Sequence, residues 1–126
     1  MTDKRKDIAV WFEIPASDFP RASGFYEAIF ATKLDRMEYG GRAMGVFPYE
    51  AGNVSGAVTE MPARAGGDQG TVVFFNCDGR LDDVAGRVEA AGGRLLTPRV
   101  ELPNDMGSFY QIADTEGNRV GLHAVV

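Results

Sequence analysis

The 126-residue sequence predicts a single α+β domain made of two βαβββ modules. The first observation is an internal repeat. Residues 44–58, "MGVFPYEAGNVSGAV", match residues 106–124, "MGSFYQIADTEGNRVGLHA", from a Met-Gly-x-Phe start to a Gly-Asn turn and a glycine-containing strand. The second is that a strand ending in Asp18 or Asp78 precedes an amphipathic helix before each copy. The third is a Gly-rich polar stretch between the copies, residues 62–70, which indicates a flexible linker.

The first module is expected over about residues 7–61. It opens with a strand over residues 8–18, after which Ser17 or Asp18 suits the N-cap of a helix and Pro20 its first turn. Apolar residues spaced i, i+3, i+4, i+7 and i+8 indicate that helix: Ala22, Phe25, Tyr26, Ile29 and Phe30. Three further strands are expected, over residues 33–39, 43–49 and 54–61.

The second module is expected over about residues 71–126. Its helix has Asp78 near the N-cap, a stop signal at Gly92-Gly93, and one apolar face formed by Leu81, Val84, Ala85 and Val88. Strands are expected before it, within residues 70–79, and after it, over residues 94–102, 107–113 and 119–126. Two such modules facing one another would bury both helices on one side and leave a concave opposite side, which is the natural binding site.

Composition excludes several classes of function. The net charge is -5 with no basic stripe, so a nucleic-acid partner is not expected. No apolar run approaches the roughly 20 residues that cross a membrane, and the N-terminus lacks a secretory signal, so we expect a cytoplasmic protein. The single cysteine, Cys77, excludes an intramolecular disulfide and a Cys-rich zinc site, and its strand context favours core packing.

Three segments, residues 12–30, 87–96 and 106–122, resemble in order and spacing the vicinal-oxygen-chelate superfamily, which contains glyoxalase I, bleomycin-resistance proteins and extradiol dioxygenases. The resemblance covers nearly the whole chain. It implies a U-shaped mixed sheet around a cleft, and commonly a homodimer. In metal-using members the resemblance places the ligands on the first and last strand of each module.

The residues at those ligand positions do not suit a metal. The resemblance carries the four positions over to Trp11, Gly56, Val72 and Gly121, none of which offers a side-chain ligand for a divalent ion. We therefore expect neither a metal nor a cofactor. The Trp11 indole gives an apolar surface on one side of the site, and the two glycines leave space on the others, which suits a flat organic ligand.

Strand alternation predicts which side chains face the cleft. Phe12 and Ile14 should face the first helix, and Val73 and Phe75 the second. The candidate ligand-binding residues are then Trp11, Glu13, Gly56, Val72, Phe74, Asn76, Gly121 and His123.

The leading hypothesis is a metal-free homodimer that binds a small apolar or aromatic molecule in the cleft, and it leaves open whether a reaction is catalysed. A first alternative is a lyase, isomerase or dioxygenase of the glyoxalase type, in which Glu13 and His123 form a displaced metal site or an acid/base pair. A second alternative is a structural or partner-binding dimer with a vestigial cleft. Under the leading hypothesis, Glu13 and His123 are solvated or hydrogen-bonded residues near strand ends.

Overall fold

The computed structural model describes residues 11–50, 53–61, 72–103 and 105–126, and it confirms an α+β fold of two modules. The first module contains β1 (Trp11–Ala16), α1 (Phe19–Phe30), β2 (Asp35–Tyr39), β3 (Arg42–Val46) and β4 (Ser55–Glu60). The second contains β5 (Val73–Asn76), α2 (Leu81–Arg87), β6 (Arg94–Leu95), β7 (Val100–Glu101), β8 (Ser108–Ala113) and β9 (Arg119–Ala124). The predicted linker over residues 62–70 and the strand start before Trp11 lie outside the described residues.

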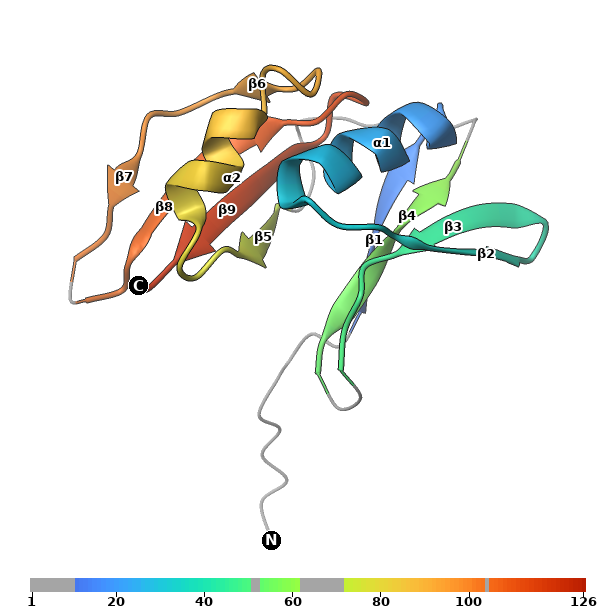
Figure 1. Ribbon diagram of the computed structural model, residues 1–126, viewed down its shortest axis with the longest axis horizontal. Coiled ribbons are helices and arrows are strands. Elements are labelled where there is room, and N and C mark those ends of the chain that lie inside the picture. The colour runs from blue at the N-terminus through green and yellow to red at the C-terminus, as the bar shows by residue number, and fades with distance from the viewer. Residues whose placement is uncertain (1–10, 51–52, 62–71, 104) are drawn as a thin grey trace, which may run out of the picture.

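The two modules share one strand order. The first sheet runs β1-β4-β3-β2, and the second runs β5-β9-β8-β6, with β7 also paired to β8. In each module the first and last strands pair in parallel and the other pairs are antiparallel. A parallel pair needs a long crossover connection, and α1 or α2 lies within it. Figure 1 shows both helices at the centre, with the first sheet on the right and the second on the left.

Both modules contribute to one hydrophobic core. Its buried members come from the predicted faces of α1 and α2 and from the strands beneath them, for example Ile14, Tyr26, Val84, Ile112 and Leu122. This confirms the helical spacing in both modules and the inward direction of Ile14. The Phe75 ring faces the helices and contacts α1, because it lies 5.9 Å from the Tyr26 ring and 5.1 Å from the Phe30 ring. Its contact with the second helix stays a prediction.

The second module agrees with prediction at the start of α2 but departs from it in its second strand. Arg80 is the N-cap residue of α2 and caps it with no side-chain hydrogen bond, and Asp78 lies two residues before it, near the N-cap as predicted. The Asp78 carboxylate accepts a hydrogen bond from the Val125 N–H at 2.7 Å. The strand predicted over residues 94–102 is interrupted between β6 and β7. Pro98 lies in the interruption, and a proline cannot donate to the ladder.

The second module supplies partners for both ends of α1. At the N-terminus Asp18 is the N-cap, as predicted, and its carboxylate accepts from the Arg21 N–H. The Asp18 N–H donates to the Glu116 carboxylate at 3.1 Å. At the C-terminus the guanidinium groups of Arg80 and Arg87 donate to the carbonyls of Phe30 and Ile29 at 3.1 and 2.8 Å. Anionic groups near a helix N-terminus and cationic groups near its C-terminus stabilise the helix.

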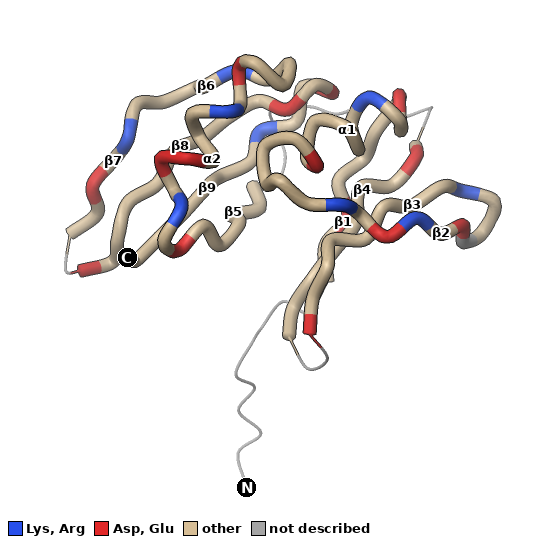
Figure 2. Tube along the Cα trace, in the orientation of Figure 1, with Lys and Arg blue, Asp and Glu red and all other residues tan. Residues whose placement is uncertain are grey.

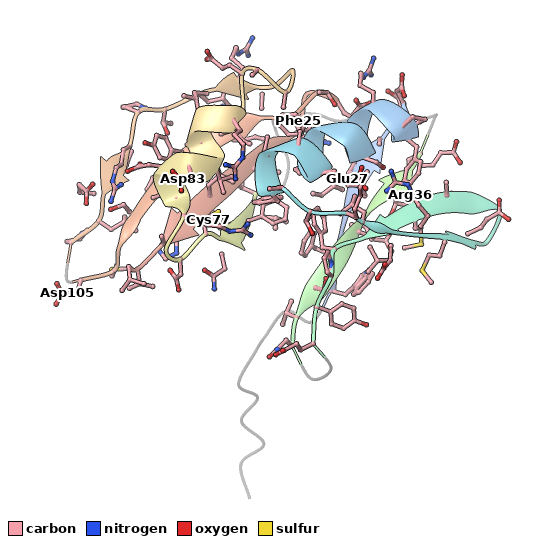
Figure 3. The ribbon with its side chains drawn as sticks, viewed as in Figure 1. Phe25, Glu27, Arg36, Cys77, Asp83 and Asp105 are labelled. Carbon is pink, nitrogen blue, oxygen red and sulfur yellow. The ribbon has the colours of Figure 1, made fainter. Side chains whose placement is uncertain are left out.

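Charged residues of both signs are interspersed over the two modules (Figure 2). One exposed pair links α1 to β2 within the first module, where Arg36 donates to the Glu27 carboxylate at 3.0 Å (Figure 3). None of the helices in the described ranges is long and apolar enough to cross a membrane.

Candidate functional site

Each sheet has one face that lies away from the helices, which we call the helix-free face. In the first module it carries Trp11 and Glu13, whose side chains are exposed, as alternation predicts. The Trp11 indole N–H donates to the Glu13 carboxylate at 3.3 Å, and its ring lies 6.4 Å from that of Tyr49. Glu13 pairs in register with Ala57, so Ala57 shares this face.

The helix-free face of the second module carries most of the other predicted site residues. Phe74 pairs with Gly121 and Asn76 pairs with His123, so these four residues share one face. A Cβ on Gly121 would lie within 2.1 Å of the Phe74 ring, and therefore the glycine allows the ring to lie across β9. Val72 precedes β5 and shares this face by alternation. The His123 Nε2 atom is hydrogen-bonded to the Met106 carbonyl at 2.8 Å.

Gly56 lies on the other face of its sheet. It pairs with Phe12, and a Cβ there would lie within 2.6 Å of the Phe12 ring. Ala57 pairs with Glu13 and so lies on the helix-free face, as Gly121 does opposite Phe74. The residue counted from the Gly-Asn turn in the first module, Gly56, is therefore on the face opposite to the predicted one.

A pocket lies between the modules, and we call it the phenylalanine pocket. Its volume is about 600 Å³, and five rings line it: Phe12, Phe30, Phe47, Phe74 and Phe75. The Phe75 ring of β5 lies 5.5 Å from that of Phe12 and 5.3 Å from that of Phe47, so first- and second-module rings meet there. A concave site of this size, with aromatic rings and polar groups in its lining, suits a small organic ligand.

Polar groups also line this pocket. Asn76 and Arg80 line it from the second module, and Thr32 and Ser55 from the first. A smaller neighbouring pocket of about 170 Å³ is lined in part by Phe74, Asn76 and His123. The structure therefore brings three of the predicted site residues together there.

The remaining predicted residues lie outside both pockets. Trp11, Glu13, Gly56, Val72 and Gly121 are not among the lining residues of either. In the described part of the chain, Glu13 and His123 share no hydrogen bond with one another: Glu13 is bonded to Trp11, and His123 to Met106.

Comparison with protein-family models gives a match over residues 8–122 to the Glyoxalase/Bleomycin resistance protein/Dioxygenase superfamily. The chain belongs to this superfamily. The resemblance found in the sequence is thereby confirmed. No curated protein matches the chain significantly.

Solved structures of the superfamily share the fold. A glyoxalase/bleomycin resistance protein from Albidiferax ferrireducens T118 superposes with a TM-score of 0.72 at 14% identity, covering 94% of this chain and 98% of that one. A V278E mutant of glyoxalase I from Zea mays gives 0.69 at 16% identity, over 92% of this chain and 45% of that one. The fosfomycin resistance protein FosX from Mesorhizobium loti gives 0.62 at 15% identity, over 96% and 93%.

The superfamily's metal chemistry can be tested against the side chains present. The residues that the resemblance carries over to its ligand positions, Trp11, Gly56, Val72 and Gly121, offer no carboxylate, imidazole or thiolate, and neither does Ala57 beside Gly56. Over the described ranges, no three His, Cys, Asp or Glu side chains cluster in a way that could hold a metal ion. The residues at these positions do not fit a divalent metal.

Sequence reasoning missed the residues that form most of the phenylalanine pocket. Phe12 and Phe75 were correctly read as facing the helices, but alternation along one strand cannot show that the helix-facing rings of two modules meet. Arg80 carries no local signal either, since it follows an ordinary Asp-Gly turn. The abundance of phenylalanine, with eight in the chain, was the one available indication.

Proposed function

We propose that this protein binds a small apolar or aromatic molecule in the phenylalanine pocket and does so without a metal ion. One observation carries the proposal: five phenylalanine rings from both modules line a single pocket of about 600 Å³. Aromatic rings bind other rings through edge-to-face and offset contacts at little conformational cost. The four predicted metal-ligand positions carry no side chain that could bind a metal, which supports binding of the ligand by the pocket residues alone.

The test is binding of N-phenyl-1-naphthylamine, a neutral probe whose fluorescence rises in apolar surroundings. Wild-type protein should bind it, and Val54→Trp should weaken binding at least about tenfold, because Val54 lines the pocket and the larger side chain would fill it. Met37→Trp is the matched control, since Met37 is another exposed apolar residue, on β2 outside the pocket lining. Equal affinity in both variants, or no binding by the wild type, would contradict the proposal.

Metal content is measured on the same preparation. Elemental analysis should find no stoichiometric zinc, nickel, manganese or iron. A bound metal that is lost in His123→Ala would favour the glyoxalase-type enzyme instead. That alternative has less support here, because Glu13 and His123 are each hydrogen-bonded to other groups.

A homodimer in the cytoplasm stays a prediction from the sequence. Light scattering after size-exclusion chromatography measures the mass directly and separates a 13.6 kDa monomer from a dimer. If the protein is a dimer but binds no probe, the partner-binding alternative is favoured. Binding would be detected as a rise in stability, because a ligand specific to the native state must stabilise that state.

A further inference from the structure

Arg80 is the one cationic side chain among the residues that line the phenylalanine pocket in the described part of the chain. It lies at the start of α2, where its N–H donates to the Cys77 carbonyl at 2.9 Å. Its guanidinium donates through Nη1 to the Phe30 carbonyl at 3.1 Å, and its Cζ lies 5.4 Å from the centre of the Phe30 ring. The head group is therefore held over a pocket wall by two contacts.

Within the described ranges, no carboxylate lines the phenylalanine pocket or forms an ion pair with Arg80, although Asp82 and Asp83 lie beside Arg80 in a different surface pocket. The two acidic residues nearest in sequence have other partners: Asp78 accepts from the Val125 N–H, and Asp82 accepts from Arg99 and from the Tyr110 hydroxyl. A guanidinium has five N–H donors, and the Phe30 carbonyl accepts from only one nitrogen, so donors remain for a ligand.

Asn76 gives a second donor on the same pocket wall. Its Oδ1 atom accepts from the Asp78 N–H at 2.9 Å, which fixes the orientation of the amide. The Nδ2 group is then left as a donor. Ser55 differs, because its hydroxyl already donates to the Phe47 carbonyl at 2.9 Å.

We propose that the ligand of the phenylalanine pocket is an aromatic or bulky apolar carboxylate, with its ring among the phenylalanines and its carboxylate on Arg80 and Asn76. Arginine binds carboxylates strongly because its planar donors match the two oxygens. The net charge of -5 repels anions in general, so an anionic ligand needs this local cation. This inference rests on the proposed function and adds the charge of the ligand to it.

The experiment compares 1-naphthoate with its neutral counterpart 1-naphthalenemethanol by calorimetry. Wild-type protein should bind the carboxylate more tightly than the alcohol. Arg80→Gln should lower the affinity for the carboxylate about 10- to 100-fold and change the affinity for the alcohol little. Arg87→Gln is the matched control: it also loses a hydrogen bond to the end of α1, but Arg87 does not line the pocket. Arg80→Lys, which keeps the charge, should restore part of the affinity.

The possible outcomes separate the two proposals. If both probes bind equally and Arg80→Gln changes neither, the inference is overturned and the proposed function stands. If neither probe binds, both are overturned. If Arg87→Gln lowers the affinity for naphthoate as much as Arg80→Gln does, the loss is due to the missing hydrogen bond to the end of α1, and the inference is wrong. Circular dichroism melting of each variant identifies any that fails to fold, in which case Asn76→Ala measures the second donor instead.

Discussion

The Glu116 carboxylate in the turn between β8 and β9 accepts a hydrogen bond from the Arg21 Nε of α1 at 2.8 Å, across the boundary between the modules. The Glu116 side chain is fully enclosed, whereas that of Arg21 is half exposed. The same carboxylate also accepts from the Ser17 and Thr115 hydroxyls. A charge buried at such an interface needs this complete set of donors.

Replacement of Glu116 by glutamine should destabilise the protein by about 2 kcal/mol. The neutral amide would bind Arg21 more weakly than the carboxylate does. Its NH₂ group would also face the Ser17 hydroxyl and the Asp18 N–H, which are themselves donors. Urea unfolding at pH 7 measures the change. Glu89→Gln is the control, since Glu89 is exposed and its side chain forms no hydrogen bond in the described structure. A loss below about 0.5 kcal/mol for Glu116→Gln would show that the contact contributes little.

The stability contributed by Glu116 should depend on pH. Burial acts to raise its pKa, but the hydrogen bonds from Arg21, Thr115, Asp18 and Ser17 outweigh burial and lower the pKa from 4.5 to about 2. A pKa lowered by folding stabilises the native state above the unfolded pKa, and the contribution is lost as the pH falls. The free-energy difference between wild type and Glu116→Gln should therefore shrink between about pH 5 and pH 2. A constant difference across this range would contradict the lowered pKa.

Tyr26 forms a second contact across the module boundary. Its hydroxyl donates to the Asp114 carboxylate at 2.7 Å, and the side chain is fully buried. Burial and the adjacent carboxylate raise the pKa of Tyr26, which keeps the phenol protonated as a donor. Tyr26→Phe should cost about 2 kcal/mol in the free energy of unfolding. Tyr49→Phe, at an exposed ring, should change it by less than about 0.5 kcal/mol.

Gly93, after α2, is required for close packing. A Cβ there would lie 2.6 Å from the Ala113 carbonyl oxygen and 2.6 Å from the buried Phe25 ring. Gly93→Ala should destabilise the protein by about 1–3 kcal/mol, because neither neighbour can move freely. Gly86→Ala in α2 is the control with the opposite sign: nothing lies within 4 Å, and alanine favours a helix. Thermal melting distinguishes the two.

Cys77 should be unreactive in the native protein. The side chain is fully buried in the core near α2, and burial raises the pKa of its thiol (Figure 3). Reaction with a thiol reagent requires an accessible thiolate. Ellman's reagent at pH 8 should therefore titrate one thiol per chain in denaturant and react with the folded protein only as it opens. Rapid stoichiometric reaction without denaturant would contradict the burial.

Much of the fold could be predicted because its signals are local. The spacing of Phe25, Tyr26 and Ile29 and the Asp18 N-cap specify α1 without reference to the rest of the chain. The repeated Gly-Asn turns specify the second copy of the module. Alternation correctly assigned Trp11 and Glu13 to one face of β1 and Val120 and Leu122 to the core face of β9.

The candidate site could be predicted only in part. Phe74 and Asn76 were correctly placed on one face of β5, and both line the phenylalanine pocket. The assignment of Gly56 to that site depended on a count along the chain, but the register between β1 and β4 places Gly56 on the opposite face, paired with Phe12. A shift of one residue moves a side chain to the opposite face of a sheet.

The sequence by itself determined the two modules and their helices, because these follow from residue type and short-range period. Only the tertiary structure decided that the Phe12 ring contacts the Phe75 ring. The same holds for the hydrogen bond from Arg80 to the C-terminal end of α1 and for the one that Glu116 accepts at the N-terminal end of α1. Each contact joins residues more than 45 positions apart in the chain. Such contacts depend on how two separately patterned modules pack together, and no short-range pattern encodes that packing.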